Sequence, residues 1–400
     1  MSTERRTQQR SVAKLIWPIV LTQACTSAAV GLNLTIAALA AVLVTGQENL
    51  GGLAQTSTII GATLITVAAP HLAARADRLF SLRCTIVLAM LGSVVCSIAV
   101  AFSDRLGWLL FVGLFLLGGG TVSTLTSRFV AAEKLGPNEQ TSSAIGIVLF
   151  GSAAGSVIGP NLYGLVSAAT ESAMQIAFLS SAAVFGLGLI PLSLEQRKDY
   201  TQTLKPHGQS DTEMRISWTP SYSRVFFIAI IAHSVMVSLM TMAPLYTDRA
   251  FGPSGSGVVM TAHLLGMYAF GPLVSVALTR FGLRCTTAIG AAVLALSTCT
   301  LIFFHGVFAL FILGLFGVGL GWSVGMVTSS SEVSKVAAAG ERVALQGRLD
   351  IWINLAAGVS SICSGVVVAA VGYPNLAIAV LIIAVAATVL FALFERTRHS

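Results

Sequence analysis

Twelve apolar runs occupy most of this chain, and each is long enough to cross a bilayer as a helix. A helix rises 1.5 Å per residue, so about 20 residues cross the ~30 Å of hydrocarbon. The runs are continuous, unlike the ten-residue segments of alternating hydrophobicity that mark membrane β-barrels. The sequence therefore predicts an all-α membrane protein with twelve transmembrane helices. The predicted spans are 15–44, 51–73, 84–102, 108–130, 143–167, 172–194, 225–246, 255–278, 285–304, 306–328, 349–371 and 374–394.

The composition excludes a water-soluble fold. Hydrophobic residues make up 55% of the chain and charged residues only 10%, whereas a soluble domain carries roughly 25% charged residues. The lipid bilayer is therefore an expected partner of this surface.

The chain also repeats itself at an offset of 201 residues. Several clusters recur in register over more than 80 residues, which indicates a duplicated half and not chance matches among common apolar residues. Many secondary transporters are built from two such halves, with a site at their interface near the middle of the bilayer. The matches are Leu82-Arg83-Cys84-Thr85 with Leu283-Arg284-Cys285-Thr286, Gly113-Leu114-Phe115 with Gly314-Leu315-Phe316, Gly118 with Gly319, Gly120 with Gly321, Lys134 with Lys335, Gly146 with Gly347, and Gly164 with Gly365.

The charge pattern predicts the topology. The net charge is +7, but all 23 Lys and Arg residues except Arg105 and Arg249 fall on the side that holds both termini. Positively charged loops stay in the cytoplasm, so we expect both termini to be cytoplasmic in a bacterial-type cell membrane. The charge then reports topology, and no nucleic-acid partner is expected.

One long polar break divides the chain. Residues 195–224 carry mixed charge and separate the first six spans from the last six. We expect a six-helix bundle over 1–194, a cytoplasmic linker over 195–224 and a second six-helix bundle over 225–400. A small regulatory element is the alternative for the linker.

The fifth span carries the most specific local pattern. Glycines four apart let a neighbouring backbone approach closely, and a Gly-Pro pair removes a hydrogen-bond donor from the helix. Ordinary close packing would explain a single pair of such glycines. The full spacing resembles the fifth-span signature of proton-coupled drug exporters in the major facilitator superfamily, except that Tyr163 replaces a glycine. The resemblance implies the two-bundle major facilitator fold and outward antiport. The pattern is Gly146, Gly155, Gly159-Pro160 and Gly164.

The turns after spans 2 and 8 resemble two degraded copies of another superfamily motif. The first copy keeps Asp77-Arg78 and a later arginine, and the second keeps Arg280-Phe281-Gly282 without the acid. The resemblance implies that this turn latches the two halves on the cytoplasmic side. Asp77 is suited to a helix N-terminus, where the helix dipole favours a negative charge. The alternative is a pair of solvated basic turns.

The fourth span departs from the exporter pattern. Proton-coupled relatives carry an arginine before the glycines of this span, and here Leu114 precedes Gly118. A facilitator or importer of a neutral metabolite therefore stays open as an alternative to efflux, and so does a membrane sensor that no longer transports.

Three titratable groups are candidates for proton coupling. His233 and His263 lie within spans, and Asp350 lies near the start of span 11. Histidine titrates near neutral pH, and an intramembrane carboxylate is costly and usually functional. The alternatives are neutral histidines that hydrogen-bond within the bundle, and an Asp350 paired with nearby arginines.

The resemblance implies that spans 1, 4, 7 and 10 line the substrate cavity. Polar or soft side chains on these spans are candidate substrate contacts, and each could instead pack between helices. Since few charges are available, we expect a neutral or weakly charged amphipathic small molecule. The candidates are Thr22, Gln23, Thr26, Asn33, His233, Met236, Met240 and Trp322.

Together these features predict a monomeric secondary transporter that works by alternating access and exports its substrate against protons. The sequence contains neither a phosphate-binding Gly-x-x-x-x-Gly-Lys-Ser/Thr loop nor a His-Glu-x-x-His helix, so no enzyme activity, cofactor or metal is expected.

Overall fold

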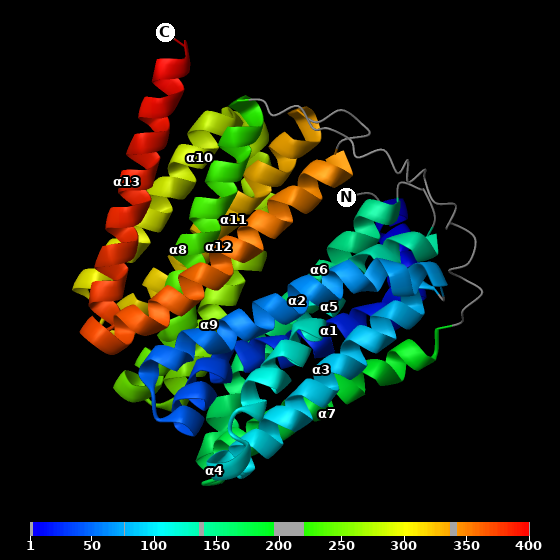
Figure 1. The fold of residues 1–400 in the computed structure, drawn as a ribbon. Coiled ribbons are helices and arrows are strands. Elements are labelled where there is room, and N and C mark those ends of the chain that lie inside the picture. The colour runs from blue at the N-terminus through cyan, green and yellow to red at the C-terminus, as the bar shows by residue number, and fades with distance from the viewer. Residues whose placement is uncertain (1–2, 76, 136–139, 196–219, 337–341, 400) are drawn as a thin grey trace. The chain divides into compact units, whose positions relative to one another are not determined.

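The computed structural model describes residues 3–75, 77–135, 140–195, 220–336 and 342–399 (Figure 1). Within these ranges every regular element is a helix, which confirms the all-α prediction. Residues 196–219, the greater part of the predicted linker, lie outside the described residues. The helices are α1 (Thr3–Thr45), η1 (Glu48–Leu50), α2 (Gly51–Arg75), α3 (Arg78–Ala101), α4 (Ser103–Leu106), α5 (Leu109–Leu135), α6 (Gln140–Ala169), α7 (Ala173–Ser193), α8 (Pro220–Phe251), α9 (Pro253–Tyr268), α10 (Gly271–Phe303), α11 (Phe308–Val336), α12 (Arg342–Val371) and α13 (Tyr373–His399).

The helices account for the twelve predicted spans. Ten segments of the described chain are long and apolar enough to cross a membrane, and one of them, Pro253–Phe303, is 51 residues long and holds two predicted spans. The two are divided at Gly282, whose φ of 75° is a left-handed conformation that glycine adopts without steric cost. The predicted fifth span, which is not among the ten, is the 30-residue helix α6.

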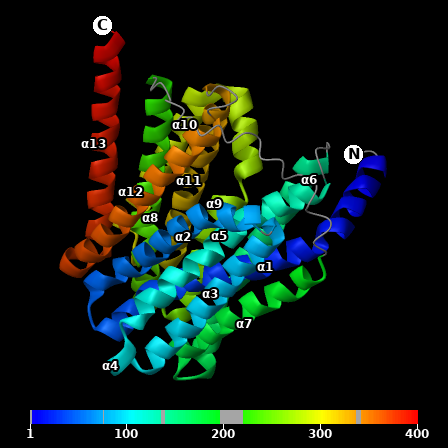
Figure 2. The same ribbon diagram turned by 45° about the vertical axis from the view of Figure 1, so that its right-hand side comes forward.

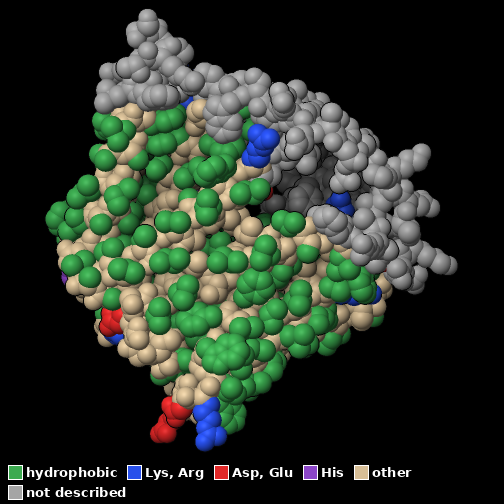
Figure 3. Space-filling view, in the orientation of Figure 1, with side chains coloured by type: hydrophobic (Ala, Val, Ile, Leu, Met, Phe, Trp, Pro, Cys, Tyr) green, Lys and Arg blue, Asp and Glu red, His purple; other side chains and the backbone are tan. Residues whose placement is uncertain are grey.

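The helices present an apolar outer surface. Hydrophobic side chains are spread over the whole described part of the face in Figure 3, and charged side chains are few on it. Phe150 and Phe303 are each 74% exposed, and Leu296 is 71% exposed. Apolar surface on this scale fits contact with lipid.

The chain forms two compact units. The first comprises Met1–Gly46 and Ser57–Glu213, and the second comprises Gln47–Thr56 and Met214–Ser400. The segment 47–56, which includes η1 and the first residues of α2, thus packs with the second unit.

In the first unit, α1 packs closely against α6. A methyl group added to Gly159 of α6 would lie 2.7 Å from the carbonyl carbon of Ala28, and one added to Gly155 would lie 2.8 Å from the nitrogen of Ala28. Such distances leave no room for any side chain larger than hydrogen, so glycines four apart bring the two backbones into contact.

The second unit repeats a helix crossing of the first. In the first unit, Gly118 of α5 meets the backbone of α2 at Thr58 and Ala62. In the second, Gly319 of α11 meets the backbone of α9 at His263 and Met267. Gly118 and Gly319 are 201 residues apart, while their partners are 205 apart. The duplication therefore extends to the crossing, with four additional residues before α9.

Segment 47–56 is held against α12 by the same kind of close approach. The Ser361 hydroxyl donates to the carbonyl of Gly52 at 2.7 Å, and the Thr56 hydroxyl donates to the carbonyl of Gly358 at 3.1 Å. In Figures 1 and 2, α12 lies beside α8, and α8 also packs against α11. Helices α8, α9 and α11 carry the candidate site.

Candidate functional site

The structure brings together two of the predicted site residues, His233 of α8 and Trp322 of α11. Trp322 donates its indole N–H to Nδ1 of His233 at 2.7 Å. The two ring centroids are 5.9 Å apart, with the planes inclined at 52°. This hydrogen bond joins side chains of two different spans in the second unit.

This bond fixes the proton on His233. An indole nitrogen only donates, so Nδ1 must accept and the neutral ring carries its proton on Nε2. Nε2 has no hydrogen-bond partner among the described residues, and the residue as a whole is partly exposed. His233 thus carries an Nε2–H donor within a membrane span that has no acceptor among the described residues.

His263 of α9 has the opposite arrangement. Its side chain is fully buried, and its Nδ1 lies 2.8 Å from the carbonyl oxygen of Leu315 on α11. A carbonyl only accepts, so Nδ1 carries the proton, and Nε2 is buried with no partner in the described part of the chain. The backbone of His263 also forms the close crossing with Gly319. This geometry fits a histidine that joins two packed helices.

The remaining candidates of the second unit lie in different surroundings. Met236 and Met240 are 2% and 5% exposed and belong to the buried core of α8. Asp350 is exposed near the start of α12, where its carbonyl accepts from the Asn354 side chain at 2.8 Å.

The four polar candidates of the first span are all buried within the first unit. Thr22 donates to the carbonyl of Gly188 at 2.8 Å, and Asn33 donates to the Ser181 hydroxyl at 2.7 Å, so both join α1 to α7. Thr26 donates to the carbonyl of Gln23 in its own helix.

Gln23 reaches a second helix as well. Its side-chain nitrogen lies 3.3 Å from the carbonyl oxygen of Thr124 on α5. Among the described residues, the side-chain oxygens of Gln23 and Asn33 are buried without a partner. Three of these four side chains thus join α1 to a neighbouring helix, and two buried acceptors are left over.

The predicted latch residues have local partners. Asp77 is buried and caps α3 by accepting from the backbone N–H of Phe80, as its suitability for a helix N-terminus predicted. Arg78 is the first residue of that helix and is partly buried. Arg280 is exposed and lies over the ring of Phe281, 5.7 Å from its centroid.

The glycine and proline candidates lie on α6. Helix α6 continues through Pro160, which is buried, as is Gly164. The surroundings of Gly146 are outside the described part of the structure.

A charged cluster at the end of the first unit was not predicted. Arg83 of α3 donates to the carbonyl of Leu192 at 2.7 Å and to that of Glu195 at 3.2 Å, so it caps the C-terminus of α7. Lys134 of α5 pairs with the buried carboxylate of Glu195 at 2.7 Å. The positions of the basic residues in the sequence predicted the topology, but only the fold shows that Arg83 and Lys134 contact Glu195.

Sequence reasoning also missed Tyr268, the last residue of α9. Its ring stands at 83° to that of Trp322, with the centroids 6.1 Å apart, and its side chain is 45% exposed. We call His233, Trp322 and Tyr268 the ring cluster. The sequence signal that could have indicated Tyr268 is the pair Gly271-Pro272, because it interrupts the predicted span just after this residue.

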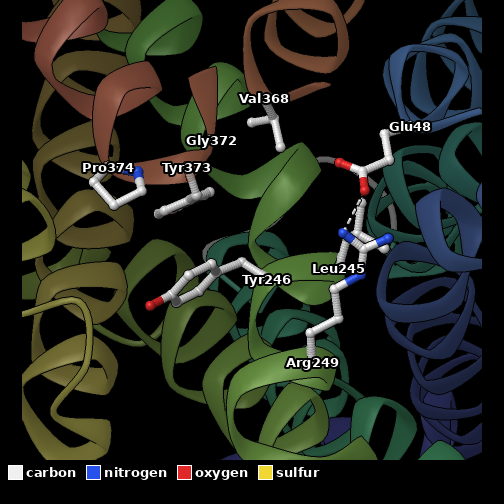
Figure 4. A pocket seen from close by; sticks show the side chains of 8 residues that line it. All are labelled: Glu48, Leu245, Tyr246, Arg249, Val368, Gly372, Tyr373 and Pro374. Atoms are coloured by element: carbon white, nitrogen blue, oxygen red, sulfur yellow. Dashed lines mark hydrogen bonds and ion pairs between the residues drawn. The ribbon is translucent and has the colours of Figure 1, made fainter. Parts of the chain in front are cut away.

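The second unit holds a separate cavity of about 210 Å³ beside segment 47–56 (Figure 4). Glu48 and Arg249 form an ion pair of 2.7 Å at its edge. Tyr246 and Tyr373 stack with centroids 5.1 Å apart. Glu48 and Arg249 are 201 residues apart, which is the offset of the duplication. The lining residues are Glu48, Leu245, Tyr246, Arg249, Val368, Gly372, Tyr373 and Pro374.

No group of three or more His, Cys, Asp or Glu side chains in the described residues is placed to hold a metal ion. The side chains of the ring cluster can form hydrogen bonds, contact other rings and, at the imidazole of His233, exchange a proton.

The family model and the similar proteins indicate the same family. The family model for the Major Facilitator Superfamily matches residues 19–255 and 225–400. YddS of Bacillus subtilis, an uncharacterized transporter of the same type, is 27% identical over 389 residues, covering 93% of this chain and 88% of its own. The riboflavin transporter RfnT of Brucella anthropi is 24% identical over 276 residues, or 66% of each chain.

Among solved structures, the nucleoside transporter NupG superimposes with a TM-score of 0.73 at 14% identity. The match covers 94% of this chain and 98% of that one. At this identity the likeness shows the fold alone, and it confirms the predicted arrangement of transmembrane helices.

Proposed function

Because the chain belongs to the Major Facilitator Superfamily, a family of membrane transporters, we propose that it exports a small, uncharged amphipathic compound in exchange for protons. The observation that carries the proposal is the hydrogen bond from Trp322 to Nδ1 of His233, a partly exposed residue within a membrane span. The predicted spans contain no Asp, Glu, Lys or Arg near their centres, so imidazole is the group best suited to exchange a proton at depth.

The geometry gives proton binding a structural consequence. A proton arriving at His233 must bind Nδ1, because Nε2 already carries one. Nδ1 then becomes a donor and can no longer accept from Trp322, so the 2.7 Å bond must break. Protonation of His233 thereby requires α8 and α11 to change their contact, which is how a proton would bias one state of an alternating-access carrier.

His263 and Asp350 are less suited to this role. Protonating His263 would put a charge on a fully buried ring whose Nε2 has no partner among the described residues. Asp350 is exposed near the start of α12.

The outward direction rests on the fifth-span resemblance, in which Gly155 and Gly159 hold α6 against α1. We further propose both termini in the cytoplasm of a cell-membrane protein that works as a monomer. Asp77, Arg78 and Arg280 are retained as proposed latch residues.

Uptake of a fluorescent amphipathic dye into inverted membrane vesicles, with and without an imposed proton gradient, tests the proposal. Wild type should accumulate dye only with the gradient. His233→Gln should lose that dependence, whereas His263→Gln and Asp350→Asn should keep it. Gly159→Leu provides the control in which α1 and α6 cannot pack. If none of the three single replacements alters the gradient dependence, the proton-coupling proposal fails.

A facilitator or importer of a neutral metabolite is the second candidate, and one observation favours it. A relative over 276 residues is named a riboflavin transporter. Riboflavin uptake into right-side-out vesicles, independent of a proton gradient, would support this candidate over export.

A further inference from the structure

The ring cluster joins three helices of the second unit. Trp322 of α11 lies between two neighbours: its N–H bonds His233 of α8, and its ring meets Tyr268 of α9 edge to face. Aromatic pairs favour edge-to-face or offset geometries with centroids roughly 4.5–7 Å apart, and 6.1 Å lies within that range. The indole is thus held in one orientation by one polar and one aromatic contact.

Tyr268 lies where the predicted span 255–278 is interrupted near its middle. Helix α9 ends at Tyr268, and α10 begins at Gly271, with Pro272 in its first turn. Proline has no N–H to donate to the carbonyl four residues before it, which is that of Tyr268. Interrupted helices near the middle of the bilayer commonly border substrate sites in transporters.

The cluster offers two kinds of recognition. The 45% exposed ring of Tyr268 and the partly exposed ring of Trp322 supply aromatic surface. The Nε2–H of His233 supplies one hydrogen-bond donor that has no partner in the described residues. A planar ring that carries a carbonyl oxygen or an aromatic nitrogen can use both.

We propose that the ring cluster is the subsite that binds a planar, uncharged heteroaromatic part of the substrate, with its ring against Trp322 and Tyr268 and its acceptor on His233. This inference rests on the proposed transport function and specifies its substrate class. Trp322 also acts as a positioning residue, because its N–H holds His233 in the tautomer that donates from Nε2.

Binding of a matched pair of uncharged probes to the purified full chain tests the subsite. The probes are 2-naphthamide and its saturated counterpart, decahydronaphthalene-2-carboxamide, which share the carbonyl acceptor and differ in aromaticity. Naphthalene itself, which lacks the acceptor, is the third probe. We expect 2-naphthamide to bind roughly fivefold more tightly than either of the others, because the saturated amide lacks the aromatic contact and naphthalene lacks the hydrogen bond.

The variants separate the two kinds of recognition. Tyr268→Leu and Trp322→Leu should abolish the preference for the aromatic amide over the saturated one, and Tyr268→Phe should retain it. His233→Leu should abolish the preference for 2-naphthamide over naphthalene and leave the aromatic preference in place. Each variant is first checked for a monodisperse elution profile, so that a misfolded chain is not scored.

The outcomes are distinguishable from failure of the transport proposal, because binding is measured without a proton gradient. Equal binding of the two amides, or an aromatic preference unchanged in both leucine variants, would overturn the subsite. So would absence of 2-naphthamide binding to folded wild type. If wild type shows the expected probe preferences but no gradient-driven dye uptake, proton coupling is rejected and the subsite is retained.

Discussion

The contact between α1 and α6 predicts a specific cost for one methyl group. In Gly159→Ala the new carbon would lie 2.7 Å from the carbonyl carbon of Ala28 and 2.8 Å from its Cα. Carbon atoms in contact prefer about 3.5–4.0 Å. The two helices must therefore separate by about 1 Å, and because the obstructing atoms are backbone, no side-chain rotation relieves the overlap.

A matched substitution isolates that cost. Gly186 lies on α7 in the same unit, and a methyl group there would meet only the sulfur of Met90 at 3.6 Å, an ordinary contact. Both alanines gain roughly 0.5–1 kcal/mol of helix stability over glycine. This gain cancels when the free energies of unfolding of the two variants are compared. The remaining difference is the cost of overpacking at Gly159, about 1–3 kcal/mol.

Thermal unfolding of the detergent-solubilised protein, followed by size-exclusion chromatography of heated samples, measures the difference. At about 2–4 °C per kcal/mol for units of this size, Gly159→Ala should unfold roughly 2–12 °C below Gly186→Ala. Gly155→Ala should behave like Gly159→Ala, because its methyl would lie 2.8 Å from the nitrogen of Ala28. If Gly159→Ala and Gly186→Ala unfold at the same temperature, the backbone contact between α1 and α6 is not as close as described.

Three further predictions concern other contacts. Lys134→Met should lower stability by about 1.5–3 kcal/mol because it removes a charged donor from the buried carboxylate of Glu195, and Lys134→Met/Glu195→Leu should regain much of the loss in the same unfolding assay. Gly52→Ala should destabilise the second unit, since its methyl would lie 2.9 Å from the carbonyl carbon of Ser361, whereas Gly358→Ala on the facing helix, with 3.7 Å to its nearest neighbour, should not. Charge reversal of the exposed pair of Glu48 and Arg249 should show a coupling of only about 0.2–1 kcal/mol in a double-mutant cycle, and a larger value would contradict the solvent-screened geometry.

The sequence predicted the number and order of the spans because apolar length is a local property. Helix ends were predicted less well. The third span was expected from residue 84, but α3 begins at Arg78, because Asp77 caps it and hydrogen bonding continues into the polar turn. The seventh span was expected from 225, and α8 begins at Pro220. Hydropathy finds the part of a helix in lipid, while caps and prolines set where the helix itself starts.

The candidate site was predicted in part. His233 and Trp322 were both selected for their chemistry, but their 2.7 Å bond depends on how α8 and α11 are rotated against each other, which no local pattern contains. Tyr268 was missed because a single aromatic residue in a span is unremarkable without the helix end that follows it. The charged partners Lys134 and Glu195 are 61 residues apart and meet only through packing.

Comparison of the two duplicated halves distinguishes residues needed for helix packing from residues of the candidate site. The two halves share the glycine crossing at Gly118 and Gly319, so each retains the backbone contacts that hold a bundle together. The ring cluster has no such counterpart. In the first half, Leu32 and Thr121 stand at the positions of His233 and Trp322, at an offset of 201. Thr63 stands at the position of Tyr268, at the offset of 205 that applies to α9. None of these is aromatic or titrates near neutral pH, so packing alone did not require the rings. A feature that is absent from the copy with the same scaffold is not required by packing, which supports the proposal that proton exchange and ring recognition belong to the second half.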